Sequence, residues 1–362
     1  MGQKGVNHMS EKKICLVMPS LIVGGMERVM SELANYLVAN DASVWLILMF
    51  RDEMFYKLDP RIQVIEPSFR KKSNLSYAFF LFPFVRRKIK SIHPDVVLSF
   101  GERYNSYVLL ASLGLPYPVY ISDRSSPNKS LSRFNLWMSK QLYKKAAGIV
   151  AQTSKAAELL SKRLNGAQAN IRVIPNPLRE IVRADYPKKN QIVALGRMVR
   201  EKRYDRLLEI MSLMKDQSWK LLIVGDGSLR PQVESLIIEY GLQDRVVLAG
   251  QQKEVDQYLE ESKIYVLSSD IEGYPNALCE AMAHGLACVS FDCVAGPSDI
   301  IKNRKNGILI EDGHTELFAR ELDLLIENED TRRELGEEAK KIQDTLRSDR
   351  IFELYLTFIF PH

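Results

Sequence analysis

Two glutamates stand eight positions apart in the segment Glu272-Gly-Tyr-Pro-Asn-Ala-Leu-Cys-Glu280. An apolar run at 263–269 that is typical of a strand precedes them, and residues 276–284 have helical composition. The pattern predicts Glu272 on a loop and Glu280 on the first turns of a helix. Unpaired N–H groups at a helix start favour anions, so a sugar phosphate could lie there with a carboxylate on either side. A nucleotide sugar would use all of these groups. Favourable charge against the helix dipole remains the simpler interpretation of a glutamate in this position.

Two cations, Arg197 and Lys202, lie just after the predicted strand 191–195, in the segment Gly196-Arg-Met-Val-Arg-Glu-Lys202. Arg197 and Lys202 suit a diphosphate, because fixed cations stabilise a leaving nucleoside diphosphate more in the transition state than in the ground state. They would make a metal ion unnecessary. The alternative is a solvated basic face, since Arg200 and Arg203 share the segment.

A glycine pair, Gly24-Gly25, follows the first predicted strand and opens a helix expected at about 26–40. Without side chains there, a ligand phosphate could approach the backbone and the helix N-terminus. A dinucleotide-binding dehydrogenase would carry G-x-G-x-x-G at this turn, and the chain supplies neither the third glycine nor the spacing. Gly225-Asp-Gly227 is likewise a fragment of that fingerprint, and a plain tight turn remains the alternative for both clusters.

Composition indicates a globular chain of two domains, with 362 residues of which 46% are hydrophobic. A formal charge of +5 is too small to argue for nucleic-acid binding. The four cysteines form no CxxC pair and are expected to be reduced and buried. No run reaches the ~20 apolar residues of a spanning helix, and no secretory signal is evident. These features predict a cytoplasmic protein, with residues 1–8 vector-derived or disordered.

Short apolar runs alternate with amphipathic segments in two sets, which predicts an α/β fold with two Rossmann-like βαβ domains facing across a cleft. Two prolines in Val173-Ile-Pro-Asn-Pro-Leu178 and the polar stretch that follows place the linker between the sets. The predicted strands are 14–19, 44–50, 96–100, 119–122, 148–152, 191–195, 220–224, 245–249, 264–268 and 287–291.

From residue 12 onward the chain resembles the retaining glycosyltransferases of family 4, which have the GT-B fold. The Glu272/Glu280 pair, the Gly-Arg-x-x-x-Glu-Lys segment and the Gly-Gly loop carry the resemblance. It implies an acceptor-binding domain at 9–176, a donor-binding domain at 177–344 and a last helix, about 345–362, packed on the first domain. It also implies that Glu280 contacts the donor's ribose, Arg197 and Lys202 its diphosphate, and Glu272 its sugar. The further donor-binding residues it implies are Gly24, Gly25, Gly273, Tyr274, Pro275, Asn276, Ala277 and Leu278.

One departure from the family pattern lies in Ile121-Ser-Asp-Arg-Ser-Ser126, where many relatives carry a histidine at the position of Arg124. An arginine cannot act as a general base near neutral pH, so in a site it would bind phosphate or donor oxygens. In the mechanism that the resemblance implies, the leaving phosphate accepts the acceptor's proton. A contribution of Asp123 to acceptor activation is a separate hypothesis. The chain has no Asp-x-Asp motif, so we expect neither a metal nor another cofactor.

Basic residues flank an aromatic and aliphatic run at 70–90, a pattern that suits the headgroup region of an anionic membrane. The alternative is a helix with a buried apolar face and exposed lysines. We expect transfer of a hexose or N-acetylhexosamine from a UDP-linked nucleotide sugar to a lipid-linked or polysaccharide-repeat acceptor. The expected setting is bacterial surface-glycan assembly, including lipopolysaccharide, at the inner face of the cell membrane. A nucleotide-sugar epimerase or hydrolase of the same fold, or a non-catalytic nucleotide-sugar-binding protein, remains the alternative.

Overall fold

The structure is a computed structural model that describes residues 11–68, 74–124, 132–164, 169–294 and 296–361. The chain divides into two compact units, Met1–Pro177 with Ser348–His362 (unit 1) and Leu178–Arg347 (unit 2). The predicted boundaries, after residues 176 and 344, lie one and three residues from these divisions. The expectation for residues 1–8 falls outside the described residues.

Unit 1 contains a seven-stranded parallel sheet in the order β3-β2-β1-β4-β5-β6-β7. Its central strands are buried along their length because helices cover both faces, as the continuous apolar runs predict. The strands are β1 (Lys13–Met18), β2 (Ser43–Leu48), β3 (Gln63–Ile65), β4 (Val96–Phe100), β5 (Val119–Asp123), β6 (Gly148–Ala151) and β7 (Ile171–Val173).

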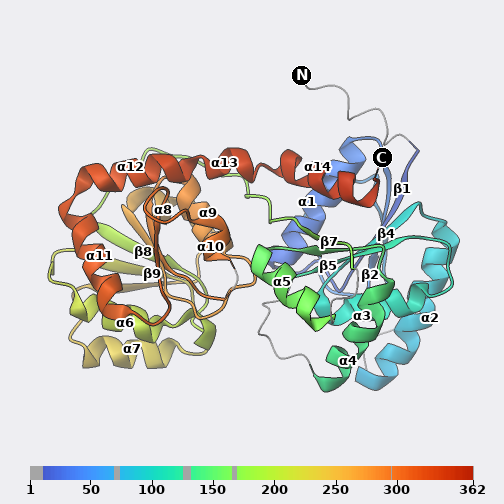
Figure 1. Cartoon of the computed structure of the whole chain (residues 1–362), viewed down its shortest axis with the longest axis horizontal. Coiled ribbons are helices and arrows are strands. Elements are labelled where there is room, and N and C mark those ends of the chain that lie inside the picture. The colour runs from blue at the N-terminus through green and yellow to red at the C-terminus, as the bar shows by residue number, and fades with distance from the viewer. Residues whose placement is uncertain (1–10, 69–73, 125–131, 165–168, 295, 362) are drawn as a thin grey trace. The chain divides into compact units, whose positions relative to one another are not determined.

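Helices of unit 1 lie on both faces of this sheet, with α2, α3 and α4 on one side and α1 and α14 on the other (Figure 1). Tyr36 of α1 packs against Phe352 of α14 at 5.3 Å between ring centroids, so the last helix joins the core of unit 1. The helices are α1 (Gly25–Ala39), α2 (Asn74–Ile92), α3 (Glu102–Ser112), α4 (Arg133–Leu142), η2 (Tyr143–Lys145), α5 (Ser154–Arg163) and α14 (Ser348–Ile359).

Unit 2 contains a six-stranded parallel sheet in the order β10-β9-β8-β11-β12-β13. Connections from β8 run first toward β10 and then back toward β13, so the order reverses between β8 and β11. The strands are β8 (Gln191–Leu195), β9 (Lys220–Val224), β10 (Val246–Gly250), β11 (Ile264–Leu267), β12 (Ala287–Phe291) and β13 (Ile308–Ile310).

Helices of unit 2 also cover both faces of its sheet, with α6 and α7 on one side and α8 and α9 on the other (Figure 1). A hydrophobic core lies under α6, α7 and α11, where Phe291 packs against Phe318 at 4.8 Å between ring centroids. The helices are η3 (Arg200–Lys202), α6 (Tyr204–Leu213), α7 (Arg230–Glu239), α8 (Asp256–Glu261), α9 (Asn276–Ala283), α10 (Pro297–Ile300), α11 (Thr315–Glu327), α12 (Glu329–Lys340) and α13 (Ile342–Thr345).

The α/β prediction is confirmed, and each predicted strand is observed within a few residues of its expected bounds. Three strands, β3, β7 and β13, were not predicted, and each has three residues. All four cysteines are free and buried, as expected. Among the helices of the described ranges, none combines the length and apolarity that crossing a bilayer requires.

Candidate active site

A pocket of about 610 Å³ opens in unit 2 at the carboxyl ends of β8, β9 and β11. β8 and β11 flank the point where the strand order reverses, and open parallel sheets bind ligands in the crevice at such a point. Gln251 and Gln252, just after β10, contribute a further wall. The whole pocket therefore belongs to unit 2.

Two loops at the pocket floor, after β8 and β9, touch each other backbone to backbone. Gly225 has φ 147° and Gly196 has φ 148°, a region that residues with a Cβ rarely adopt. A Cβ on Gly225 would lie 2.0 Å from the carbonyl oxygen of Gly196. The N–H of Met198 donates to the carbonyl of Asp226 at 2.9 Å. The glycines thus let the two loops meet, and this contact fixes the backbone of Arg197 between them.

Lys202, which follows β8, and Glu272, which follows the neighbouring strand β11, form an ion pair at 2.7 Å in the pocket. The hydroxyl of Ser269 donates to the same oxygen, Oε1 of Glu272, also at 2.7 Å. Glu272 is 8% exposed, so the pair is largely removed from water. Arg197 lies exposed in the same pocket, and none of the ion pairs among the described residues involves it. Lys202 is thus paired with Glu272, and Arg197 faces solvent.

Helix α9 points its start at the pocket, and Tyr274 to Leu278 line it. Pro275 is the N-cap and supplies no side-chain hydrogen bond, so the first-turn N–H groups are not capped by it. The positive end of the helix dipole therefore faces the cavity, where it favours a negative ligand. Gly273, also predicted here from the sequence, does not line the pocket.

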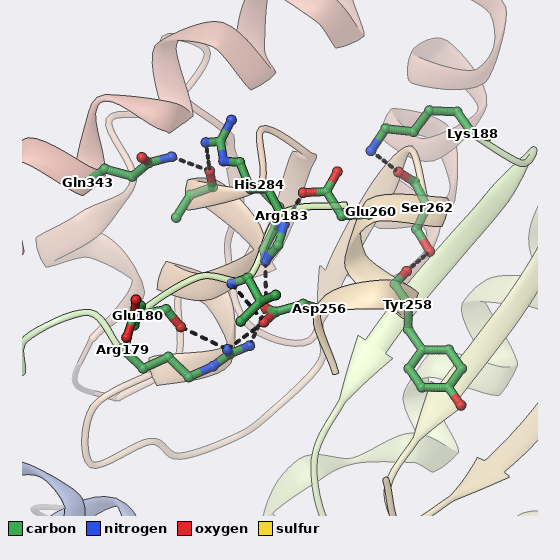
Figure 2. Close-up of polar contacts among 12 residues, drawn as sticks. Arg179, Glu180, Arg183, Lys188, Asp256, Tyr258, Glu260, Ser262, His284 and Gln343 are labelled. Atoms are coloured by element: carbon green, nitrogen blue, oxygen red, sulfur yellow. Dashed lines mark hydrogen bonds and ion pairs between the residues drawn. The ribbon is translucent and has the colours of Figure 1, made fainter. Parts of the chain in front are cut away.

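The second glutamate, Glu280, reaches the pocket from the second turn of α9. Its Oε2 lies 3.1 Å from Nε of Arg179, a residue that the sequence analysis did not select. The other guanidinium nitrogens of Arg179 donate to both carboxylate oxygens of Asp256, at 2.9 and 2.5 Å (Figure 2). The predicted pair of glutamates thus lies in one pocket, each held by a different cation.

Asp256 also receives a hydrogen bond from the ring of His284, whose Nε2 lies 2.8 Å from Oδ1 (Figure 2). Burial raises the pKa of Asp256, but hydrogen bonds from Arg179 and His284 outweigh it, so the pKa lies below its usual range. Asp256 is therefore an anion at neutral pH. Arg179, Asp256 and His284 are far apart in the sequence, and no local motif marks them.

No group of three or more His, Cys, Asp or Glu side chains close enough to hold a metal ion occurs in the part of the chain that the structure covers. The charged groups that line the pocket are Arg197, Lys202, Asp226, Glu272 and Glu280.

Comparison with known families assigns the chain. Residues 180–342 match the family Glycosyl transferases group 1, and residues 23–179 match Glycosyltransferase Family 4. Together these matches span both units of the two-sheet fold. The chain belongs to the GT-B glycosyltransferases.

Several relatives of this glycosyltransferase are named as enzymes of bacterial glycan assembly. The amylovoran biosynthesis glycosyltransferase of Erwinia amylovora is 28% identical over 329 residues, which cover 87% of this chain and 90% of the relative. An N-acetylgalactosaminyltransferase of Campylobacter jejuni, named for an undecaprenyl-diphosphate-linked glycan, is 26% identical over 96% of this chain and 98% of its own. An Anabaena protein solved in complex with UDP superimposes with a TM-score of 0.78 at 17% identity, covering 95% and 98% of the two chains.

The remaining predicted residues of the glycosyltransferase lie in unit 1, and the glycine loop is one group of them. Gly24 exchanges hydrogen bonds with the hydroxyl of Tyr56, at 3.2 Å from its N–H and 2.8 Å to its carbonyl. Gly25 begins α1, as predicted. A Cβ on Gly24 would lie 2.1 Å from Oε2 of Glu27, so the loop closes tightly over the first turn of α1.

Arg124 lies beside this loop and makes contacts within unit 1. Its guanidinium carbon is 4.3 Å from the centre of the Phe100 ring. Its nitrogens donate to the hydroxyls of Ser122 and Tyr355, both at 3.1 Å. Burial raises the pKa of Glu27, and the charge of Arg124 offsets only part of that rise. Arg124 therefore links the sheet to α14 and lies close to the glycine loop.

Asp123, the neighbouring candidate, ends β5 and is 9% exposed. Its Oδ2 lies 3.7 Å from Nη1 of Arg163 on α5. The carboxylate is thus placed at the carboxyl edge of the first sheet, next to a cation.

Proposed function

We propose that this glycosyltransferase moves a hexose or N-acetylhexosamine from a UDP-sugar to a lipid-linked or polysaccharide-repeat acceptor in bacterial surface-glycan assembly, with retention at the anomeric carbon. The observation that carries the proposal is the unit 2 pocket, where Lys202, Glu272, Glu280 and the start of α9 converge. The activities for which the relatives are named support the glycan setting, and the structural neighbour solved with UDP supports the nucleotide.

Each charged group of the pocket has a role in this proposal. Glu280 accepts hydrogen bonds from the ribose hydroxyls, and Arg197 and Lys202 bind the diphosphate together with the N-terminus of α9. Both hydrogen bonds to Glu272 end on Oε1, and within the described ranges none ends on Oε2. That oxygen is available to a hydroxyl of the donor sugar.

The reaction breaks the bond between the anomeric carbon and the β-phosphate oxygen of the donor. The acceptor hydroxyl oxygen forms its new bond on the same face of that carbon, and its proton passes to the leaving phosphate oxygen. Arg197 and Lys202 stabilise the charge that grows on the diphosphate, so no metal is required in this proposal. Glu272 holds the sugar in place while the bonds exchange.

Replacing Glu280 by alanine is expected to weaken UDP binding by ~1–3 kcal/mol, because the ribose hydroxyls lose their charged acceptor. Calorimetry with UDP, GDP and ADP, in buffer containing a chelator, measures this loss and tests the metal-free proposal. Glu239→Ala, at an exposed site on α7, is the matched control and should bind like wild type.

The outcome that contradicts the donor-site proposal is a wild type that binds none of the three nucleotides. Binding that appears only when a divalent ion is added would contradict the metal-free part alone. Release of free sugar from the bound donor, with no transfer to any acceptor, would favour a hydrolase.

Membrane contact is the second part of the proposal. The segment 70–90, which the sequence analysis selected for this contact, is partly buried and partly outside the described residues, so another surface is considered. Arg70, Lys71 and Lys72 fall outside the described residues. In the described half of α2, Leu81, Phe84 and Val85 are buried in the core of unit 1. This half fits the alternative of a buried apolar face, although Phe80 is 54% exposed.

Helix α4 offers a more exposed aromatic surface. Phe134 and Trp137 are each 59% exposed and stack at 6.3 Å between ring centroids. Arg133 and Lys140 are exposed on the same helix, which contains no acidic residue. Aromatic rings beside cations suit the interface of an anionic membrane. We therefore propose that α4 makes the membrane contact.

Wild-type protein is expected to sediment with vesicles that contain phosphatidylglycerol, and moderate salt should release it. The double variant Phe134→Ala/Trp137→Ala should sediment less, because it loses the rings that enter the interface. Ile238→Ala, which removes an exposed apolar side chain from unit 2, is the control. Equal sedimentation of all three proteins would contradict the α4 surface.

A further inference from the structure

Five ionisable side chains of unit 2 form a chain of alternating partners that ends at Glu280. Starting from the pocket, Glu280 contacts Arg179 at 3.1 Å, and Arg179 contacts Asp256 at 2.5 and 2.9 Å. Asp256 then contacts His284 at 2.8 Å, and His284 contacts Glu260 at 2.7 Å (Figure 2). The chain connects a pocket residue to the interior of the unit.

The geometry points to a positioning role: we propose that Arg179 holds the Glu280 carboxylate in place for the donor's ribose, and that buried His284 fixes Arg179 through Asp256. This proposal rests on the donor-binding role proposed above for Glu280. The new element is that Arg179, Asp256 and His284 hold Glu280 and thereby set the preference for a ribose over a deoxyribose.

The planar shape of Arg179 links the position of Glu280 to that of Asp256. A guanidinium is a rigid plane with donors in a fixed fork, so it cannot move one bonded carboxylate independently of the other. Two nitrogens of Arg179 bind both oxygens of Asp256, and Nε faces Oε2 of Glu280. The position of Asp256 therefore determines where Glu280 is held. With Oε2 on Arg179, Oε1 is the oxygen left to meet ribose hydroxyls.

Asp256 is fixed more firmly than a surface carboxylate. It accepts from Arg179, from the ring of His284 and, at 3.2 Å, from the N–H of Val182. Its side chain is 8% exposed, so little water competes with these donors. A carboxylate that accepts several hydrogen bonds in a site with little water has one favoured position. Because Arg179 is bonded to both of its oxygens, the position of Arg179 is fixed as well.

His284 anchors the interior end of the chain. Its side chain is fully buried, and Nδ1 and Nε2 each face a carboxylate oxygen. Ionised carboxylates only accept hydrogen bonds, so the two contacts are both satisfied when both ring nitrogens donate. His284 is also the C-cap of α9, four residues after Glu280. The helix that carries Glu280 is thus attached to the Arg179–Asp256 pair at two points one turn apart.

The test is the affinity for UDP compared with its 2′-deoxy and 3′-deoxy analogues, measured by calorimetry. Wild type is expected to prefer UDP over at least one analogue by about tenfold or more, since the contact involves a charged acceptor. Arg179→Gln should reduce that preference to less than about threefold. His284→Gln, whose amide cannot donate to both carboxylates in the ring's geometry, should reduce it by a smaller factor. A residue that only stabilises the fold would weaken all three ligands equally.

The control is Arg183→Gln, which removes a neighbouring arginine that touches the carbonyl of Ala283 at 3.4 Å and none of the carboxylates in the chain (Figure 2). It should keep the wild-type preference. Circular dichroism checks that each variant folds. If Arg179→Gln does not fold, Arg179→Lys carries the test, because one ammonium cannot reproduce the fork and should also lose the preference.

Three results would overturn the proposal in different ways. Wild type that binds no UDP overturns the proposed function, and this inference with it. Folded Arg179 variants that keep the full preference, while Glu280→Ala loses it, overturn the positioning role and leave the donor site intact. An unchanged preference in His284→Gln removes the interior half of the chain from the proposal.

Discussion

Replacing Lys202 by methionine is expected to lower turnover by ~10²–10³-fold, the usual cost of removing one fixed charge partner from a developing anion. The ammonium has two tasks in the proposed site. It neutralises the buried Glu272 at 2.7 Å, and it stabilises the leaving diphosphate. The change also leaves a carboxylate that is 8% exposed without its cation, which disfavours a second anion nearby. The rate is measured as UDP released from the UDP-sugar donor.

Arg200→Met is the matched control, because Arg200 belongs to the same short helix and is exposed outside the pocket. Near wild-type turnover is expected for it. Equal losses in the two variants would instead indicate that this segment acts as a general basic face, which is the alternative that the sequence left open. If Lys202→Met keeps a turnover close to that of wild type, Lys202 does not stabilise the transition state.

Gly225→Ala is expected to lower the free energy of unfolding of unit 2 by about 2–4 kcal/mol and to abolish measurable nucleotide binding. The new Cβ would lie 2.0 Å from the carbonyl oxygen of Gly196, and a backbone atom cannot swing aside as a side chain can. The φ of 147° adds strain of its own. Because the loop after β8 must shift, Arg197 and Lys202 leave their places at the pocket. Chemical unfolding and UDP calorimetry report the two effects separately.

Gly241→Ala is the control that measures backbone strain without a steric clash. Gly241 has φ 65°, and the space where its Cβ would lie is open. The substitution should cost only about 1–2 kcal/mol and leave UDP binding intact. If Gly225→Ala unfolds no more easily than Gly241→Ala and still binds UDP, the two loops are not held by the contact described here.

Local patterns were sufficient for most of the fold. Continuous apolar runs such as the one at β12 are buried on both faces, and that burial is what their composition predicts. The three missed strands have three residues each, too few to form a periodic pattern. β7 also lies directly before the prolines of the linker, whose turn signal is stronger than that of a three-residue strand.

The candidate site was predictable only where its residues share a short segment. Glu272, Glu280 and the start of α9 lie within nine positions, so their order alone placed them together. Arg179 and His284 approach Asp256 across separations of 77 and 28 residues, and their partnership depends on the crossover of the parallel sheet. A single sequence contains no periodicity that reports such contacts. The sequence marked Arg124 as a departure from the family pattern, but its stacking on Phe100 and its hydrogen bond to Tyr355 have no local signature in the sequence.

The last helix has a consequence for how the protein is made. α14 supplies Phe352 and Tyr355 to the core of unit 1, yet it is synthesised after all of unit 2. Domains generally fold in order as they leave the ribosome. Here the residues of α14 that complete the core of unit 1 are not yet available while unit 2 is being translated. A fragment that stops after residue 177 would leave the apolar surface under α14 exposed, so we do not expect the amino-terminal half to fold as an independent module.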